Sequence, residues 1–211
     1  GYDLARLVAG ACGSLGVLTE VALKVLPAPE TAATLVIAGH DARAAVAAMS
    51  RALGSPYEVT GAAHVPGEGT FLRVEGFADS VAYRAGRLQA MLGGEIEAGD
   101  ARWAGIRDVT PFHAAPGDVW RVSTIPSDAP DLIARAGAEA VLIDWGGGLI
   151  WLRMAPGTDL RARIAPLRGH ATRVRGAGAG AFHPEPDGVA ALVAGLRRKF
   201  DPRGILSPGL T

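Results

Sequence analysis

The stretch TLVIAGHDARAAVAAMSRALG, residues 34–54, decides the fold. Its opening is apolar and rich in β-propensity residues, which is typical of a buried strand. From Asp41 onward, apolar residues recur at helical spacing, with Asp41 suited to cap the first turn and Gly54 suited to end the helix. The stretch therefore predicts a strand over 34–39 and a helix over 41–53.

The chain continues in a pattern that completes one folding unit. Two strands are expected at 58–65 and 70–76, joined by a turn rich in Pro and Gly. A helix over 80–92 ends at a Gly-Gly pair, and a short strand is expected at 95–97. The resulting order, β-α-β-β-α-β, is the split βαβ pattern of ferredoxin-like folds.

The same order is predicted a second time after a linker over 99–118. This second pass consists of a strand, a helix, two strands, a helix and a strand, at 118–125, 128–137, 138–145, 148–154, 159–169 and 170–176. Two such units can share one sheet. The prediction is therefore an α+β fold, a tandem ferredoxin-like cap with a mostly antiparallel sheet and its helices on a single face.

The two ends of the chain carry other patterns. Residues 3–9 predict a short helix capped by Asp3, and the glycine-punctuated loop GACGSLG follows at 10–16. VLTEVALKVLP (17–27) alternates apolar and polar residues, which predicts a strand. An amphipathic helix is expected over 188–200, before a tail rich in Pro and Gly.

Composition excludes several classes of function. Lys plus Arg and Asp plus Glu both number 21, so the formal net charge is zero and offers no generic grip on nucleic acid or anionic membranes. A single cysteine, Cys12, excludes a disulfide framework and a Cys-rich metal site, and it fits a reducing cytoplasm. No apolar run reaches the roughly 18 residues of a membrane span. The chain opens without Met or a signal peptide, so we expect a fragment of a longer protein.

The glycines at 10, 13 and 16 allow two interpretations. Small residues let backbone N–H groups approach an anion, so the loop is suited to cradle a phosphate. Alternatively, the loop is a tight helix-to-strand turn that needs left-handed glycines. The order of helix, loop and strand excludes the Rossmann fingerprint, which runs strand, loop, helix. Cys12 is expected to be a small buried side chain within this loop.

Residues 1–29, GYDLARLVAGACGSLGVLTEVALKVLPAP, resemble the end of the FAD-binding domain in flavin-linked oxidases of the vanillyl-alcohol oxidase type. KFDPRGILSPG (199–209) resembles the C-terminal tail of that family, and the resemblance covers the whole chain. It is strongest to the smaller FAD-binding subunit of bacterial glycolate oxidases. The resemblance implies that 1–29 end an FAD domain, that 30–175 form an α+β cap domain, and that 176–211 return to the FAD domain.

The resemblance also implies a set of cofactor-binding residues. Those expected to contact FAD through the backbone or small side chains are Gly10, Ala11, Gly13, Ser14, Gly16, Val17, Leu18 and, in the tail, Ser207. Two of these depart from the family pattern, which has Ser in place of Ala11 and Asn in place of Ser207. The family's FAD domain begins with a subdomain that this chain lacks, so FAD is expected in the complete protein and not in this fragment.

The family's hydroxyacid dehydrogenases carry histidines that this chain replaces. Their His-x-Gly-Asp-Gly-Asn-x-His turn aligns with DWGGGLIW (144–151), where Asp144 and Trp151 stand for the histidines. A second turn aligns with GAGAGAF (176–182), also without its histidine. No metal site is therefore expected.

Three residues remain as catalytic candidates. By resemblance, Arg107 and Arg121 would hold the substrate carboxylate, to which guanidinium forks are suited. The alternative is that both are ordinary arginines whose stems pack beside Trp. His183 could act as a base near a flavin. The other histidines lack ligand spacing and are expected on loops or at the surface.

The resemblance implies an FAD-binding subunit of a multi-subunit 2-hydroxy acid (glycolate) oxidase. The expected partners are a larger FAD-binding catalytic subunit and an iron–sulfur subunit, with cytoplasmic localisation and, through the partners, peripheral association with the inner membrane. We expect this chain to have no useful activity on its own. Two alternatives remain: a non-catalytic assembly subunit of that complex, or a ligand-sensing tandem ferredoxin-like module. The discriminating observation is whether the complete protein carries a flavin.

Overall fold

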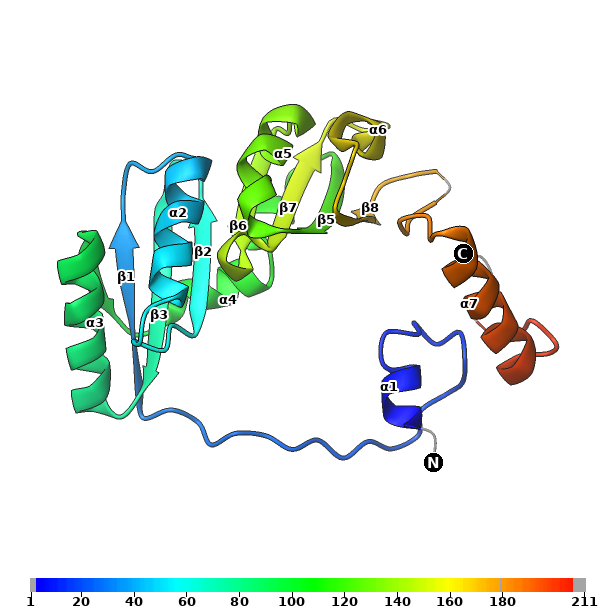
Figure 1. The fold of residues 1–211 in the computed structure, drawn as a ribbon, viewed down its shortest axis with the longest axis horizontal. Helices are drawn as coiled ribbons and strands as arrows, with labels where there is room; N and C mark the ends of the chain where they lie inside the picture. Colours follow the sequence, from blue (N-terminus) through cyan, green and yellow to red (C-terminus); the bar gives the residue numbers. More distant parts are fainter. Residues whose placement is uncertain (1–2, 179, 207–211) are drawn as a thin grey trace. The chain divides into compact units, whose positions relative to one another are not determined.

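The computed structural model describes residues 3–178 and 180–206, which divide into two compact units (Figure 1). The sheet unit is Pro27–Ala179, and the terminal unit combines Gly1–Leu26 with Gly180–Thr211. The terminal unit contains two helices, α1 (Leu4–Val8) and α7 (Asp187–Phe200).

The sheet unit contains the predicted β-α-β-β-α-β order twice. The first half comprises β1 (Thr31–Ile37), α2 (Ala42–Leu53), β2 (Gly61–Val65), β3 (Gly69–Gly76), α3 (Ala78–Leu92) and β4 (Glu95–Ala98). The second comprises β5 (Asp118–Thr124), α5 (Ala129–Ala136), β6 (Ala140–Asp144), β7 (Leu149–Met154), α6 (Leu160–Ile164) and β8 (Gly169–Arg175). The predicted α+β class and tandem order are confirmed.

All eight strands form one antiparallel sheet in the order β4-β1-β3-β2-β6-β7-β5-β8. Numbered within each half, the strand order is 4-1-3-2 in the first half and 2-3-1-4 in the second. The two halves therefore meet through their second strands, where His64 of β2 pairs with Ile143 of β6. His64 is buried, contrary to the expected surface position, and burial lowers the pKa of its imidazole.

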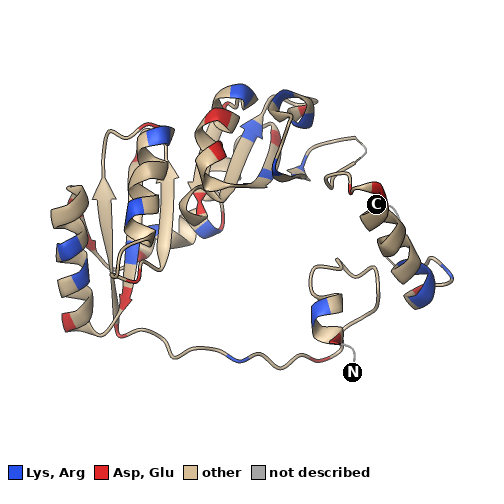
Figure 2. Cartoon of the chain, in the orientation of Figure 1, with Lys and Arg blue, Asp and Glu red and all other residues tan. Residues whose placement is uncertain are grey.

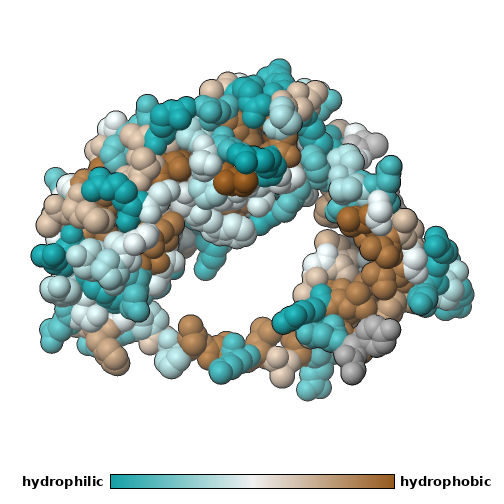
Figure 3. All heavy atoms as spheres, in the orientation of Figure 1, coloured by the Kyte–Doolittle hydropathy of each residue, from teal (hydrophilic) through white to brown (hydrophobic). Residues whose placement is uncertain are grey.

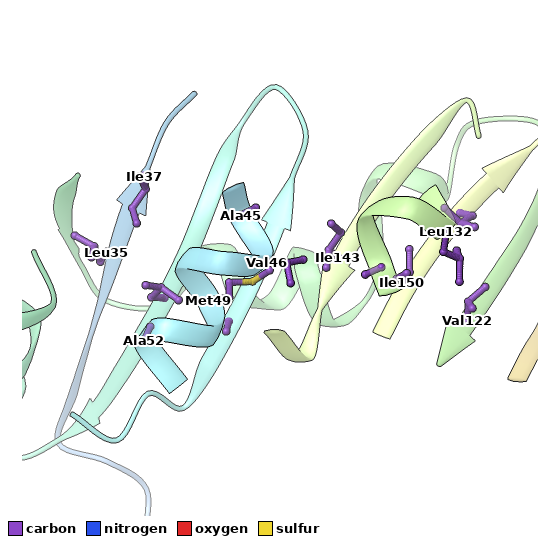
Figure 4. Packing of buried hydrophobic residues seen from close by; sticks show 14 of the residues in the cluster. Leu35, Ile37, Ala45, Val46, Met49, Ala52, Val122, Leu132, Ile143 and Ile150 are labelled. Carbon is purple, nitrogen blue, oxygen red and sulfur yellow. The ribbon is translucent and has the colours of Figure 1, made fainter. Parts of the chain in front are cut away.

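The main core lies between the sheet and the helices α2, α3, α5 and α6. Asp41 caps α2 as predicted, since its Oδ1 accepts a hydrogen bond from the Ala44 N–H at 2.8 Å. The apolar stripe of α2 then packs on the sheet through Ala45, Val46, Met49 and Ala52 (Figure 4). Each large side chain buried in this way contributes about 1.5–3 kcal/mol.

Two expectations about this region are wrong. The predicted linker over 99–118 contains α4 (Ala101–Arg107) and a 3₁₀ turn, η1 (Thr110–Phe112). Both lie on the face of the sheet opposite the main core. Trp103 and Phe112 pack there against strand residues such as Phe71, whose neighbours along the strand point into the main core. Helices therefore cover both faces, since the alternate strand residues on the second face are themselves apolar and need burial.

The strand predicted over 17–27 is also wrong. These residues form no ladder in the part of the chain that the structure describes, and the apolar side chains from Val17 to Leu26 are 62–86% exposed. A strand needs a neighbour for its backbone groups, and period-two patterning alone does not supply one. Figure 3 shows apolar atoms at the surface of the terminal unit.

The helix predicted over 188–200 is present as α7, but the structure buries none of its residues. Its last turn carries Arg197, Arg198 and Lys199 (Figure 2), a favourable position for cations at the negative end of a helix. No helix in the described ranges is long and apolar enough to cross a membrane.

Candidate functional site

The glycine loop follows directly from the end of α1. Asp3 caps this helix, as predicted, by accepting a hydrogen bond from the Arg6 N–H at 3.1 Å. The chain then turns through left-handed backbone at Gly10 (φ 80°), Cys12 (φ 50°) and Gly13 (φ 73°). Glycine adopts this conformation without the clash that a Cβ brings. The loop is therefore a tight turn, as one of the two interpretations requires.

Ser14 fixes the end of this turn. Its side chain is buried, and its hydroxyl donates to the Ala11 carbonyl at 2.6 Å, while its backbone N–H donates to the same carbonyl at 2.9 Å. Cys12, expected to be buried, is exposed. Its side chain faces solvent, and its thiol donates a hydrogen bond to the Gly10 carbonyl at 3.5 Å.

The turn opens onto a pocket of about 490 Å³ within the terminal unit. Five predicted cofactor residues line it: Ala11, Gly13, Gly16, Val17 and Leu18. The other walls come from Val8, Leu15 and, in the C-terminal tail, Ile205 and Leu206. The volume falls in the range of small-molecule sites, which are mostly apolar with a few polar groups. Gly10 and Ser14 shape the turn without lining the pocket, and Ser207 lies outside the described residues.

Asp201 builds the tail side of the pocket. Its carboxylate accepts hydrogen bonds from the backbone N–H groups of Ile205 at 3.1 Å and Leu206 at 2.7 Å. These bonds lower the pKa of Asp201, the bond from Leu206 having the larger effect. Asp201 is missing from the predicted site residues, although an Asp before Pro-x-Gly is a common signal for a side-chain-capped turn.

The pocket fits part of an FAD molecule. Gly16 lines the pocket without a left-handed backbone, and a Cβ added there would meet no described atom within 4 Å beyond its chain neighbours, so packing among the described residues does not explain this glycine. Glycine at such a position allows the backbone to approach a ligand closely. The apolar walls suit a ring system, and the turn between 10 and 16 supplies backbone to the pocket rim.

The two candidate arginines of the sheet unit differ in their surroundings. Arg107, at the end of α4, is exposed and donates to both carboxylate oxygens of Asp108, from Nε at 2.7 Å and from Nη2 at 2.9 Å. This ion pair raises the pKa of Arg107 and lowers that of Asp108. A guanidinium held in this way is not poised for another carboxylate.

Arg121, on β5, has no hydrogen-bond or ion-pair partner for its side chain in the described part of the chain. Its guanidinium lies 5.2 Å from the ring centroid of Trp145. Arg121 points to the sheet face opposite the main core, since its neighbours Trp120 and Val122 belong to that core. It is half-buried there, beside its cross-strand partner Trp151.

His183 is the remaining catalytic candidate. His183 belongs to the terminal unit, where it is half-buried, so the structure does not define His183 and the two arginines as one site. Asp144, at the end of β6, accepts a hydrogen bond from the Trp145 N–H at 2.7 Å. Burial raises the pKa of the Asp144 carboxyl, and the hydrogen bond and the charge of Arg73 oppose that rise. No group of three metal-ligating side chains occurs among the described residues.

Comparison with known proteins supplies a relative for the whole chain. No protein-family model matches it. It is 38% identical to "Glycolate oxidase subunit GlcE" of Escherichia coli (strain K12) over 213 aligned positions, which cover 99% of this chain and 57% of that protein. The chain thus spans a little more than half the length of this curated relative.

The fold and the pocket define a protein with a tandem α+β sheet joined to a glycine-loop unit. Over nearly its whole length, the chain is similar in sequence to the glycolate oxidase subunit GlcE. The resemblance predicted from the two terminal motifs is therefore confirmed. Because the match includes both termini, it accounts for sequence that a sensing module made of the sheet unit alone would leave unexplained.

Proposed function

We propose that the complete protein is the smaller FAD-binding subunit of a multi-subunit glycolate oxidase, acting in glycolate catabolism in the cytoplasm. The observation that carries the proposal is the coincidence of two facts. The chain is 38% identical to a glycolate oxidase subunit, and five of the eight residues expected to contact FAD line one pocket of suitable size.

In this proposal the glycine loop holds the cofactor. When FAD is bound, the backbone around Gly13 would hold the pyrophosphate, and the pocket-lining side chains of Val17, Leu18 and Ile205 would offer apolar surface to the rings. The chemistry that FAD supplies when bound is acceptance of a hydride from the substrate. The pocket is open and its loop must be ordered, so we expect the 211 residues alone to bind FAD weakly or not at all.

Arg121 is the proposed contact for the substrate carboxylate. It is half-buried and makes no side-chain hydrogen bond or ion pair with a described residue, whereas Arg107 is engaged by Asp108. A planar guanidinium can hold both oxygens of a 2-hydroxy acid carboxylate at once. This contact selects and orients the substrate and does not itself remove a proton.

The proposed partners are a larger FAD-binding catalytic subunit and an iron–sulfur subunit that accepts the electrons. Peripheral association with the inner membrane would come through these partners. The chain has one cysteine and therefore cannot hold a four-cysteine cluster itself.

A non-catalytic assembly role is the second candidate function. It is favoured by Asp144 and Trp151, which by resemblance stand where related dehydrogenases carry metal-binding histidines. Under this alternative the sheet unit serves for docking to the partner subunits.

One experiment separates the two roles. The complete gene product is purified alone and within its reconstituted complex, and each is assayed for a flavin spectrum and for dye reduction with glycolate. The proposal expects a flavin in the lone subunit and turnover in the complex. A colourless lone subunit with unimpaired turnover of the complex supports the assembly role. Turnover by the lone subunit that is abolished by His183→Ala would make this chain the catalyst.

A further inference from the structure

Trp145 has a combination of properties that packing does not explain. It begins the 3₁₀ turn η3 (Trp145–Gly147) after β6, with a left-handed backbone at φ 51°. Bulky residues rarely adopt this conformation. Its side chain nevertheless gains little burial, because Trp145 is 59% exposed. A strained backbone that presents a large aromatic ring to solvent is a reason to look for a function.

Surrounding contacts hold this turn in place. The Trp145 N–H donates to the Asp144 carboxylate, and the Trp145 carbonyl accepts from the Gly148 N–H at 3.1 Å. A Cβ at Gly146 would lie 2.5 Å from Leu53 Cδ1, and one at Gly147 would lie 3.2 Å from Pro126. The turn is therefore wedged between the end of α2 and the segment after β5, which fixes the backbone position from which the indole projects.

The fixed ring lies against an arginine that is unusual in this chain. Every other arginine within residues 27–178 donates a hydrogen bond or forms an ion pair with a described residue. Arg121 alone among them contacts only a ring, with its guanidinium 5.2 Å from the Trp145 centroid. The ring occupies the guanidinium face and leaves the N–H edges without an acceptor among the described residues.

We propose that Trp145 is a positioning residue for Arg121. It holds the guanidinium at a fixed place, with its N–H edges available to the carboxylate of a small 2-hydroxy acid. This inference rests on the proposed function, in which Arg121 is the carboxylate contact. Restricting a flexible arginine before the ligand arrives reduces the ordering cost of binding, so the ring strengthens binding without touching the carboxylate.

The test is glycolate binding by the 211-residue chain, followed by the NMR signals of the Arg121 side chain and the tryptophan indoles. In the wild type, both the Arg121 Nε–H and the Trp145 indole signal should shift saturably. Trp145→Gly should weaken binding about two- to tenfold, the range expected when one flexible side chain must be ordered on binding. Its melting temperature should equal or exceed that of the wild type, because glycine accepts φ 51° without strain.

Matched variants separate the possible outcomes. Trp145→Phe should retain part of the affinity, and Tyr83→Ala, which removes another exposed aromatic, should retain all of it. If the wild type shows no binding, or if Arg121→Gln binds normally, the proposed carboxylate role of Arg121 is wrong and this inference falls with it. If Arg121→Gln abolishes binding but Trp145→Gly binds as the wild type, only the inference is wrong. A large drop in melting temperature for Trp145→Gly would assign the residue a structural role and also overturn the inference.

Discussion

The indole N–H of Trp103 donates a hydrogen bond to the hydroxyl of Thr34 at 3.0 Å, joining α4 to a strand 69 residues away in the sequence. Both residues are buried. The Thr34 hydroxyl in turn donates to the Gly99 carbonyl at 3.2 Å. This single hydroxyl therefore connects the sheet, the start of the connecting segment and the helix that covers the second face.

Replacing that hydroxyl should destabilise the sheet unit. In Thr34→Val, the shape is kept but the buried Trp103 N–H loses its acceptor, which should lower the free energy of unfolding by about 1–3 kcal/mol. Thr34→Ser keeps the hydroxyl and should cost less. Urea unfolding of the two variants checks this, and equal losses in both would show that the hydrogen bond is not responsible.

Gly93 and Gly94 offer a matched pair of substitutions. Both have positive φ values, 75° and 90°. A Cβ at Gly93 would meet nothing within 4 Å, whereas one at Gly94 would overlap the Val36 carbonyl oxygen. Both alanine variants should be destabilised by the backbone conformation. Gly94→Ala should lose more, because β4 must also move away from β1, and similar melting temperatures for the pair would contradict this.

The stability of the sheet unit should depend on pH through Asp144. Its pKa is raised in the folded state, so between the unfolded and folded pKa values the folded protein binds more protons. The contribution of Asp144 to the free energy of unfolding is fully present below its pKa in the unfolded state, at about pH 4. It is lost as pH rises through its pKa in the folded state. In Asp144→Asn, which retains an oxygen acceptor for Trp145, this decline should be absent.

Asp128 provides a control, because its contribution to stability should depend on pH in the opposite direction. Its pKa is lowered, chiefly by hydrogen bonds from Arg168, so its contribution is present above about pH 4 and is lost as pH falls. Unfolding curves measured from about pH 3 to 7 should therefore diverge from the wild type in opposite directions for Asp144→Asn and Asp128→Asn. The same direction for both would contradict the assignment.

The tail side of the pocket should depend on Asp201. Asp201→Ala removes both acceptors, so the amides of Ile205 and Leu206 should exchange with solvent faster. Asp201→Asn retains one acceptor and should protect one of the two amides. Since the pKa of Asp201 is lowered, the wild-type protection should persist at neutral pH and disappear only in acid. Amide exchange followed by NMR gives the result for each residue.

The regular part of the fold was predictable because its signals are local. The cap at Asp41, the apolar stripe of α2 and the alternation of the strands each lie within a short stretch of sequence. By contrast, α4 is only seven residues long and contains Gly105, so its helical signal is weak. It is stabilised by burial of Trp103 and Ile106 against distant strands. Such tertiary contacts are not readable from a short segment.

The lining of the candidate pocket was predictable in part. The glycine loop carries a pattern with enough detail to resemble a family, and it does line a pocket with the tail. Trp145 left no comparable signal, because its left-handed backbone results from the positions of Leu53 and Pro126, which are remote in sequence. Local patterns also do not distinguish a bound arginine such as Arg107 from an available one such as Arg121.

The central claim, that the glycine-loop pocket holds FAD, is tested most directly at Gly16. This residue lines the pocket, and a Cβ there would meet no described atom within 4 Å beyond its chain neighbours, so we expect Gly16→Val to fold. Gly188→Val is the control, because Gly188 also has open space and does not line the pocket. FAD is titrated into the complete gene product and its fluorescence is followed. We expect saturable quenching in the wild type and in Gly188→Val. In Gly16→Val, FAD should bind at least about tenfold more weakly, since a side chain would occupy the place of the ligand. Wild-type affinity in Gly16→Val, or no saturable binding by the wild type, would contradict the claim.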